Sequence, residues 1–530
     1  MELGRRRLLW FWLGCVAVAA GVGLHLPMYV MAAPMHFRLA GMPMDAAMQV
    51  GMALIVAGVL LAGWGLAPHA RHGEAGSVRV RFHVADDVRL NREHAKLVLV
   101  LAVALTIDVM KPASIAFVMP GMAKEYALGM STVGYLALSA LIGTAVGSLV
   151  WGRLADWLGR RAAILLSAIM FMGTAICGTM PSFGWNLVMC FMMGAAAGGM
   201  LPIAFALMAE TIPKRHRGWL LVALGGVGTS AGYLAASAAA SLIEPEFSWR
   251  ALWLLNLPTG ALIVLLNRFI PESPRFLAAA GLPGQARAVL SRFAGSRDAV
   301  RVDQDDAGAP MAAPVPVIVE RRVGTLLRGG YARVTLALVL CGIGWGLVNF
   351  GFVLWLPASL GRLGLDTRGA GVLMAQSALL AIPGIALVVW LYQRWSSFKS
   401  LVLFVVLTVV ALLAFAVIEL ARVRAPWATI AATVALLVAI SGVIATMLPY
   451  AAEIYPLHLR ATGAGMIASG SKAGGILGAV LGVLGLFGHF TWSALVIAVP
   501  LLVSGWLLGR HGVETRGREL EAIQHEFAVR

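Results

Sequence analysis

The fold is indicated most directly by the segment Gly152-Arg153-Leu154-Ala155-Asp156-Trp157-Leu158-Gly159-Arg160-Arg161. Four of its ten residues are charged, two are glycines, and it lies between apolar runs at 131–151 and 162–180. Each run has about the 20 residues that a helix needs to cross the hydrocarbon core of a bilayer. The stretch is therefore predicted to be a short charged loop that joins two membrane-spanning helices.

Apolar runs of this kind recur along the whole chain. Hydrophobic residues make up 60% of the 530 residues and charged residues 12%, whereas soluble domains have roughly 45–50% and 25%. No water-soluble fold can bury such a share of apolar side chains, so we predict an all-α membrane protein with fourteen spans. The predicted spans are 8–33, 45–68, 97–120, 131–151, 162–180, 184–208, 219–242, 250–270, 333–356, 370–392, 399–421, 426–449, 462–486 and 490–509.

The distribution of basic residues predicts how the chain is oriented. The net charge of +16 could indicate a nucleic-acid-binding protein. However, thirty of the 41 Lys and Arg residues lie in segments on the side of the N-terminus, and only six lie in segments on the other side. This asymmetry predicts that both termini are cytoplasmic, and it accounts for the charge without nucleic acid as a partner. Short loops and an Ala-, Gly- and Arg-rich composition favour a bacterial inner membrane.

An internal repeat divides the chain into halves. Ala209-Glu210-Thr211-Ile212-Pro213, with Arg217 after it, matches Ala452-Glu453-Ile454-Tyr455-Pro456, with Arg460 after it, at an offset of 243 residues. The offset predicts two six-helix bundles related by a pseudo-twofold axis, as in secondary transporters. The predicted segments are an accessory hairpin with its linker at 1–96, bundles at 97–270 and 333–509, a cytoplasmic linker at 271–332 with a disordered-looking middle (Asp303 to Pro316), and a cytoplasmic tail at 510–530.

Three motifs at three cytoplasmic positions carry a family resemblance. The stretch 152–161 resembles the loop signature of the major facilitator superfamily. Glu210-x-x-Pro213-x-x-x-Arg217-Gly218 and Pro271-Glu272-Ser273-Pro274-Arg275 resemble the branch that holds sugar porters and organic-acid/proton symporters. The resemblance covers about 97–509 and leaves the first 96 residues unaccounted for. Within it, the loop 392–399 lacks the Gly and Asp of the signature, and the ninth span lacks the paired glutamines of sugar porters, which favours organic acids and metabolites over sugars.

The resemblance implies a function. It implies a proton-coupled symporter of a small organic solute, working by alternating access as a monomer in the bilayer, with the proton gradient as its energy source and no cofactor. Two alternatives remain open: an exporter of drugs or metabolites with the same fold, and a membrane sensor without transport. The sequence contains no enzyme signature, and its four cysteines lie in apolar runs without metal-ligand spacing. The extra hairpin is either a peripheral pair packed on one half or a module for a partner or lipid.

Charged residues inside spans are the first candidates for function, because burying a charge in the bilayer costs roughly 2.5–3.5 kcal/mol. Asp108 and Lys111 are three residues apart, so they share one face of a helix and can pair. The resemblance places this helix beside a central cavity, which makes Asp108 the candidate proton-coupling carboxylate. Lys111 would tune its pKa or meet an anionic substrate; the alternative is a static ion pair. Lys472 stands alone in its span, so it must lose its proton, find a carboxylate or face a cavity.

Two further sets of residues complete the candidates. Polar and aromatic residues within spans are candidates for substrate contact, although each residue type more often serves packing: Tyr233, Asn256, Trp345, Asn349, Trp355, Gln376 and Tyr450. The resemblance also implies a charge network that latches the halves at the cytoplasmic face. Its members would be Asp156, Arg160, Glu210, Arg217, Glu272 and Arg275, with Glu453 and Arg460 as a thinner counterpart in the second half.

Overall fold

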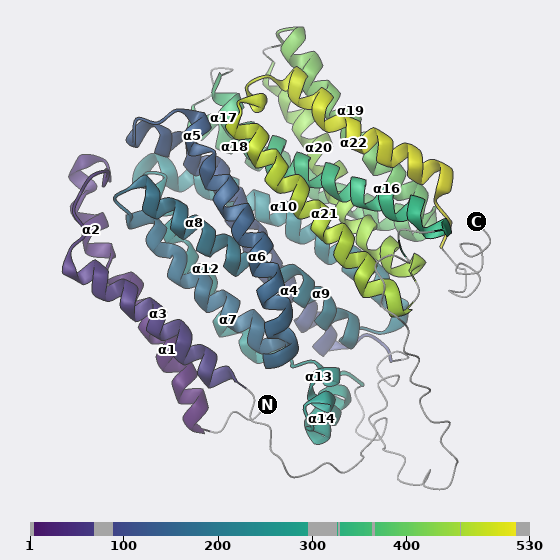
Figure 1. Ribbon diagram of the computed structural model, residues 1–530, viewed down its shortest axis with the longest axis horizontal. Coiled ribbons are helices and arrows are strands. Elements are labelled where there is room, and N and C mark those ends of the chain that lie inside the picture. Colours follow the sequence, from purple (N-terminus) through teal and green to yellow (C-terminus); the bar gives the residue numbers. More distant parts are fainter. Residues whose placement is uncertain are drawn as a thin grey trace.

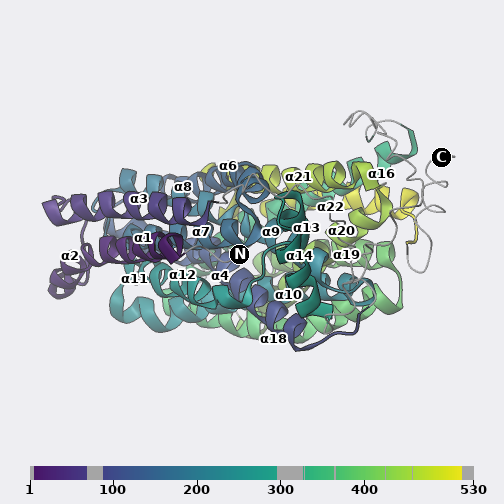
Figure 2. The same ribbon diagram turned by 90° about the horizontal axis from the view of Figure 1, so that it is seen from below.

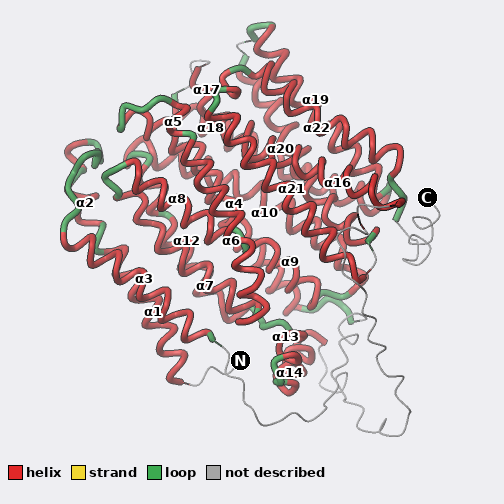
Figure 3. Tube along the Cα trace, viewed as in Figure 1, coloured by secondary structure: helices red, strands yellow, loops and turns green. Residues whose placement is uncertain are grey.

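The computed structural model describes residues 5–67, 88–294, 326, 329–362, 366–423, 425–455 and 457–515. These residues form helices and loops and contain no strand (Figure 1, Figure 3). Fourteen of the helical segments are long and apolar enough to cross a membrane. The predicted all-α membrane fold is confirmed, and its segments pack into an elongated body whose helices run roughly parallel to one another (Figure 1).

The N-terminal hairpin is a tightly packed helix pair. Its elements are α1 (Arg5–Gly23), α2 (Leu26–Met31), η1 (Ala33–Met35) and α3 (Ala46–Leu66). A Cβ atom on Gly14 would lie 2.5 Å from the Gly58 carbonyl oxygen, and one on Gly21 would lie 2.5 Å from that of Gly51. Only glycine allows the two backbones to approach so closely, which is a common device for pairing membrane helices. The helices α1 and α3 of the hairpin are therefore in close contact with each other.

The first half follows the hairpin along the chain. Its main helix, α4 (Arg92–Glu125), continues unbroken through Pro112 and Pro120. The predicted span 184–208 is divided at Gly198 and Gly199, where glycines weaken the helix. The remaining elements are α5 (Met130–Val133), α6 (Tyr135–Leu158), α7 (Arg160–Gly173), η3 (Thr174–Thr179), α8 (Phe183–Ala197), α9 (Met200–Thr211), α10 (Lys214–Phe247), α11 (Arg250–Leu254), α12 (Asn256–Leu265) and η4 (Leu266–Phe269).

Two short helices that the sequence did not predict follow the first half. In α13 (Pro274–Ala279), the Ser273 hydroxyl caps the N-terminus by accepting a hydrogen bond from the Phe276 backbone N–H at 3.1 Å. In α14 (Pro283–Ala294), Ala286, Leu290 and Phe293 form one buried face. The beginning of the predicted linker is thus helical, while Asp303 to Pro316 lies outside the described residues.

The second half lies beside the first, with α10 and α6 of the first half against α18 and α21 of the second (Figure 1, Figure 2). A Cβ atom on Gly226 of α10 would lie 2.8 Å from the Ile385 side chain of α18, so the two halves are in direct contact there. Its elements are α16 (Gly329–Gly346), the π-helix η6 (Leu347–Phe352), α17 (Val353–Arg362), α18 (Thr367–Arg394), α19 (Ser397–Leu420), α20 (Pro426–Ile454), α21 (Leu457–Val483), η7 (Leu486–Gly488) and α22 (Phe490–His511).

The ends of the membrane-spanning helices form two faces, the terminal face and the opposite face (Figure 1). The terminal face holds both described ends of the chain, near Arg5 and Thr515, together with α13 and α14 (Figure 1). The opposite face holds α2, α5 and the loops at the far ends of the spans (Figure 1). The cytoplasmic location of the termini and the limits of the two bundles stay predictions.

Candidate functional site: a central cavity

A cavity of about 220 Å³ lies between the two halves. Helices α4, α6, α8, α9 and α10 line it from the first half, and α16, η6, α17, α20 and α21 line it from the second. Most of its wall is apolar, with aromatic side chains from Phe205, Trp345 and Phe350. The polar groups are few: Asp108, Thr144, Thr229, Tyr233, Asn349, Ser471 and Lys472. An apolar wall with a few polar groups is the usual make-up of a small-molecule site.

Asp108 lines this cavity, and Lys111, three residues later on α4, is paired with it. The Lys111 Nζ atom is 3.6 Å from Asp108 Oδ1, and the Lys111 side chain is fully buried. The same Nζ lies 3.4 Å from the centre of the Phe171 ring, in a cation–π contact from α7. Neither Lys111 Nζ nor Asp108 Oδ1 has a hydrogen-bond partner within the described part of the chain. The predicted pairing is present, but it is an ion pair without a hydrogen bond.

Lys472 reaches the same cavity from α21 of the second half. Among the described residues that line the cavity it is the only cation, and Asp108 is the only carboxylate. Of the three outcomes that the sequence left open for a lone buried lysine, the structure has the one in which it faces a cavity. Lys111 does not line that cavity. It lines a much smaller adjoining one, which shares Pro112, Thr144 and Phe350 with the central cavity.

Tyr233 and Asn349 join the two halves across the cavity. The Tyr233 hydroxyl on α10 donates a hydrogen bond to Asn349 Oδ1 at 3.1 Å. Asn349 lies in the π-helix η6, and such widened turns are frequent at functional sites. Trp345, one turn earlier, donates its indole N–H to the Ile440 carbonyl at 3.0 Å, which fixes its ring. These two polar contacts hold cavity-lining side chains in place.

The other polar candidates lie elsewhere. Asn256 is buried at the start of α12, where its amide donates to the Thr174 hydroxyl at 3.4 Å, and it does not line the cavity. Gln376 is exposed in a separate crevice with Asp366 and Arg368, at the opposite face. Tyr450 donates to the Val513 carbonyl at 3.0 Å, at the terminal face.

Trp355 closes the space between the halves on the side of the opposite face. A Cβ atom on Gly134 of the first half would lie 2.8 Å from its indole ring, and one on Gly482 of the second half would lie 2.4 Å from it. The ring therefore fills a gap that only glycines leave open. This side chain, proposed from sequence for substrate contact, acts in this structure as a plug.

Several members of the predicted charge network lie at the terminal face of the first half. Arg160 lies 3.3 Å from Asp156 and 3.9 Å from Glu210. Arg217 donates to the Ile212 carbonyl at 3.0 Å, and Arg275 is exposed at the start of α13. Both of these ion pairs of Arg160 therefore join residues of the first half.

Glu272 connects these residues to the loop 152–161. Its carboxylate accepts backbone N–H groups of Arg160 at 2.6 Å and Arg161 at 3.3 Å, at the start of α7. Gly159 has φ +103°, and a Cβ atom there would lie 2.4 Å from Glu272 Oε2, so both its backbone conformation and its surroundings require glycine. Burial raises the pKa of Glu272 above its ordinary value, against the opposing effect of these backbone donors. Its neighbour Ser273 donates its hydroxyl to Glu210.

Comparison with known proteins decides the family. The sequence model described as "Major Facilitator Superfamily" matches residues 98–479, most of the chain. The chain belongs to the Major Facilitator Superfamily. It is a multi-pass membrane transporter of that superfamily, as the resemblance implied, and its N-terminal hairpin precedes the matched region.

Relatives within the superfamily carry small organic solutes. The niacin transporter NiaP of Acinetobacter baylyi is 26% identical, over 83% of this chain and 98% of that protein. The 4-hydroxybenzoate transporter PcaK of Pseudomonas aeruginosa is 28% identical, over 78% and 92%. Among solved structures, the Escherichia coli xylose transporter XylE, in a partially occluded inward-open conformation, has a TM-score of 0.64 at 14% identity, over 81% of this chain and all of that one. This last likeness concerns the fold.

The second half has a similar set of polar contacts at the terminal face. They involve Tyr392, Glu514 and Thr515, which were not among the residues predicted from sequence. Glu514, just after α22, accepts the backbone N–H of Ser397 at 3.1 Å, at the start of α19. Thr515 donates to Glu453 at 2.5 Å, and Tyr392 donates to the same carboxylate at 2.9 Å. The side chain of Arg460 lies outside the described part of the structure.

Two of these contacts, those of Glu514 and Thr515, have counterparts in the first half. Glu514 and Thr515 follow Glu272 and Ser273 by 242 residues, within one residue of the offset that revealed the repeat. Extending the offset beyond the last span would have found them. The loop 392–399 lacks the signature residues, but the next helix, α19, has a carboxylate, that of Glu514, at its N-terminus.

Proposed function

We propose that the protein moves a small organic acid together with a proton by alternating access, with the central cavity as its binding site. The observation that carries the proposal is that one cation, Lys472, and one carboxylate, Asp108, face the same cavity between the two halves. The names of the relatives support the chemical class, because niacin and 4-hydroxybenzoate are both small aromatic carboxylates.

Lys472 is proposed to bind the carboxylate of the substrate. A charge-assisted hydrogen bond of this kind contributes about 1.5–3 kcal/mol. Trp345, Phe350 and Phe205 offer aromatic faces to a planar ring, and Tyr233 with Asn349 offers polar groups. The cavity is smaller than the roughly 300–1,000 Å³ of ordinary ligand pockets, which favours a small solute.

Asp108 is proposed to carry the coupled proton, with Lys111 as its fixed counter-charge. With all three groups ionised, the two lysines and Asp108 leave one net positive charge at the site. An organic anion and a proton that bind together leave this net charge unchanged, whereas either one alone changes it by one unit. The anion alone brings the net charge of the site to zero, whereas the proton alone raises it to +2. Since uncompensated charge inside a membrane is costly, protonation of Asp108 is favoured once the anion has bound.

Alternating access would exchange the face from which the cavity is reached. With the termini in the cytoplasm of a bacterial cell, the opposite face is the outer one, and the Trp355 plug closes the cavity toward the outside. The proton gradient across the inner membrane would then supply the energy, with no cofactor and no nucleic acid, in a monomer. Export would use the same groups, so the sign of coupled proton movement decides the direction.

Uptake into proteoliposomes tests the proposal. Labelled nicotinate and 4-hydroxybenzoate are the probes, and xylose is the comparison solute. We expect uptake of at least one carboxylate, none of xylose, and a loss of at least tenfold in Lys472→Gln, equal to about 1.4 kcal/mol. Lys399→Gln is the matched control, because Lys399 is exposed and outside the cavity. Equal uptake by Lys472→Gln and the control would contradict the assigned role of Lys472.

A further inference from the structure

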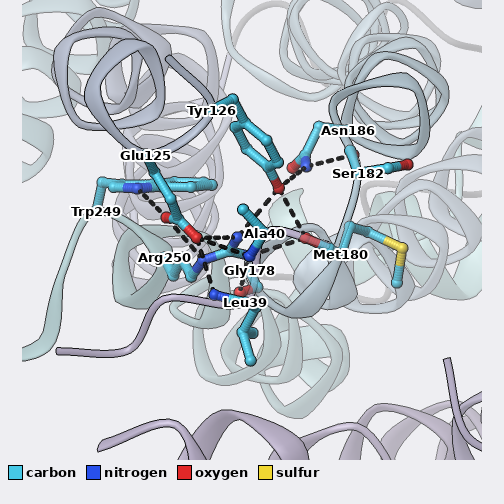
Figure 4. Close-up of polar contacts among 10 residues, drawn as sticks. All are labelled: Leu39, Ala40, Glu125, Tyr126, Gly178, Met180, Ser182, Asn186, Trp249 and Arg250. Carbon is cyan, nitrogen blue, oxygen red and sulfur yellow. Dashed lines mark hydrogen bonds and ion pairs between the residues drawn. The ribbon is translucent and has the colours of Figure 1, made fainter. Parts of the chain in front are cut away.

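The loop at the far end of the N-terminal hairpin binds a buried carboxylate of the first half. Glu125 is the last residue of α4, and only 5% of its side chain is exposed. Its Oε1 atom accepts the backbone N–H groups of Leu39 at 2.8 Å and Ala40 at 3.1 Å. Figure 4 shows these contacts within a cluster formed by Leu39, Ala40, Glu125, Trp249 and Arg250, called the Glu125 cluster below.

Arg250 neutralises this carboxylate and is itself fully bonded. Its Nε and Nη2 atoms donate to Glu125 at 3.1 and 2.7 Å, and its remaining N–H groups donate to the Gly178 and Met180 carbonyls and the Tyr126 hydroxyl. All five guanidinium donors therefore have acceptors (Figure 4). Trp249 adds an indole N–H to Glu125 Oε2 at 3.0 Å.

The hairpin supplies two of the five hydrogen bonds that Glu125 accepts. A buried carboxylate needs such donors, because a charge without them loses its solvation. Neighbouring contacts strengthen the attachment: the Tyr29 hydroxyl donates to the Phe247 carbonyl at 2.5 Å, and the Gly41 N–H donates to the Pro181 carbonyl at 3.0 Å. Every one of these partners belongs to the first half.

A second contact lies deeper in the membrane. A Cβ atom on Gly173 of α7 would lie 2.6 Å from the Ile55 side chain of α3, so the hairpin packs directly on α7. Phe171, two residues earlier in the same helix, covers Lys111. The hairpin is thus attached at the end of α4 and behind the helix that covers the Asp108–Lys111 pair.

We propose that the hairpin is a fixed part of the first half, attached through Glu125 to the end of α4, and that it moves with α4 through the transport cycle. In this role Glu125 is a positioning residue, and the only moving interface is the one between the two halves. The inference rests on the alternating access proposed above.

Paired cysteines distinguish the two interfaces. In a background with the four native cysteines replaced by alanine, Ile55→Cys with Gly173→Cys joins the hairpin to the first half across a Cβ–Cβ distance of 4.0 Å. Gly226→Cys with Ile385→Cys joins the two halves across 3.7 Å. Both distances suit a disulfide. We expect that oxidation leaves nicotinate or 4-hydroxybenzoate uptake unchanged in the first pair and lowers it at least tenfold in the second.

The outcomes separate the two proposals. If the hairpin disulfide alone stops uptake, the hairpin must move and the inference is overturned. If neither disulfide stops uptake, alternating access at this interface is wrong, while a rigid hairpin still stands. Reduction must restore the uptake that oxidation removed.

Spin-label distances give a readout that needs no transported solute. Labels at the exposed positions Met35, Trp185 and Trp427 report on the hairpin, the first half and the second half. Across pH 5 to 8, we expect one unchanged Met35–Trp185 distance, while Met35–Trp427 and Trp185–Trp427 change together. A Met35–Trp185 distance that varies would overturn the inference.

Variants of Glu125 test its part in the attachment. In Glu125→Ala, we expect hydrogen exchange at the Leu39 and Ala40 amides to rise at least tenfold and the Met35–Trp185 distance to broaden. Glu246→Ala, an exposed glutamate on the same face, is the control. Glu125→Gln keeps the acceptor oxygen and is expected to restore part of the protection. Unchanged exchange in Glu125→Ala would remove Glu125 from the inference.

Discussion

Two buried ion pairs that involve carboxylates of α4 differ in how many of their donors and acceptors are hydrogen-bonded. In the Glu125–Arg250 pair, all five guanidinium donors and both carboxylate oxygens are hydrogen-bonded, with a closest contact of 2.7 Å. In the Asp108–Lys111 pair, the charges lie 3.6 Å apart, and neither Lys111 Nζ nor Asp108 Oδ1 has a hydrogen-bond partner among the described residues. The first pair lies at the end of the helix, and the second lies beside the cavity.

The difference separates a pair with a structural role from a pair that we propose to be functional. A buried pair repays its desolvation only when further hydrogen bonds satisfy the remaining donors and acceptors. Glu125–Arg250 meets this condition and holds the hairpin. Asp108–Lys111 does not, so stability alone gives no reason to keep it, and a functional role gives one.

Removing one partner of the satisfied pair has the largest expected effect. Glu125→Ala leaves Arg250 buried without its counter-charge, so we expect a loss of about 3–5 kcal/mol in the free energy of unfolding in detergent. Glu246→Ala should change it by less than about 0.5 kcal/mol. Equal stability of the two variants would remove the distinction between the pairs.

Replacing both partners sharpens the comparison. Asp108→Asn with Lys111→Met removes two poorly satisfied charges, so we expect unchanged stability or a gain of about 1–4 kcal/mol, together with loss of proton coupling. Glu125→Gln with Arg250→Met removes a satisfied network and should destabilise the protein instead. Thermal unfolding of both double variants gives the two signs, and two equal signs would contradict the account.

The Phe171 ring tests what stabilises Lys111. Phe171→Leu keeps an apolar side chain but removes the π face, so we expect a loss of about 2 kcal/mol, the size of a desolvated cation–π contact. In the Lys111→Met background the same substitution should cost less, because the cation is gone. A double-mutant cycle on unfolding free energies measures the difference, and a coupling energy of zero would exclude the contact as a source of stability.

Glu272 extends the comparison to a buried carboxylate bonded to backbone N–H groups. Burial raises its pKa above the ordinary 4.5. The stability linked to its protonation is therefore present in full below the pKa of the unfolded chain and is lost as the pH rises through the raised folded pKa. We expect Glu272→Gln to remove this pH dependence, because the amide does not titrate. Melting curves from pH 4 to 8 check this, and an unaltered pH profile would contradict it.

Much of the fold could be predicted from sequence because lipid imposes a simple rule. Each span needs about 20 apolar residues, so the fourteen spans could be counted directly. The motif at 152–161 and the repeat at Glu210 and Glu453 then identified the superfamily. The helices α13 and α14 were missed because they depend on a cap at Ser273 and on burial against the rest of the protein.

The candidate site could be predicted only in part. Asp108 and Lys472 stood out because charges are rare in spans, and both line the cavity. Asn256 and Gln376 were chosen by polarity alone, and the faces of their helices turn them elsewhere. Glu125 and Arg250 lie at the ends of spans, where charge is ordinary, so no local pattern indicated a buried pair between residues 125 positions apart.

Proton movement driven by substrate tests the central claim most directly. Nicotinate and 4-hydroxybenzoate are added to proteoliposomes that contain a pH-sensitive dye, with wild type and Asp108→Asn in parallel. We predict that one of these carboxylates drives proton movement in wild type, and that Asp108→Asn abolishes it while substrate exchange persists. Proton movement of equal size in Asp108→Asn would contradict the account and assign the coupling to another residue.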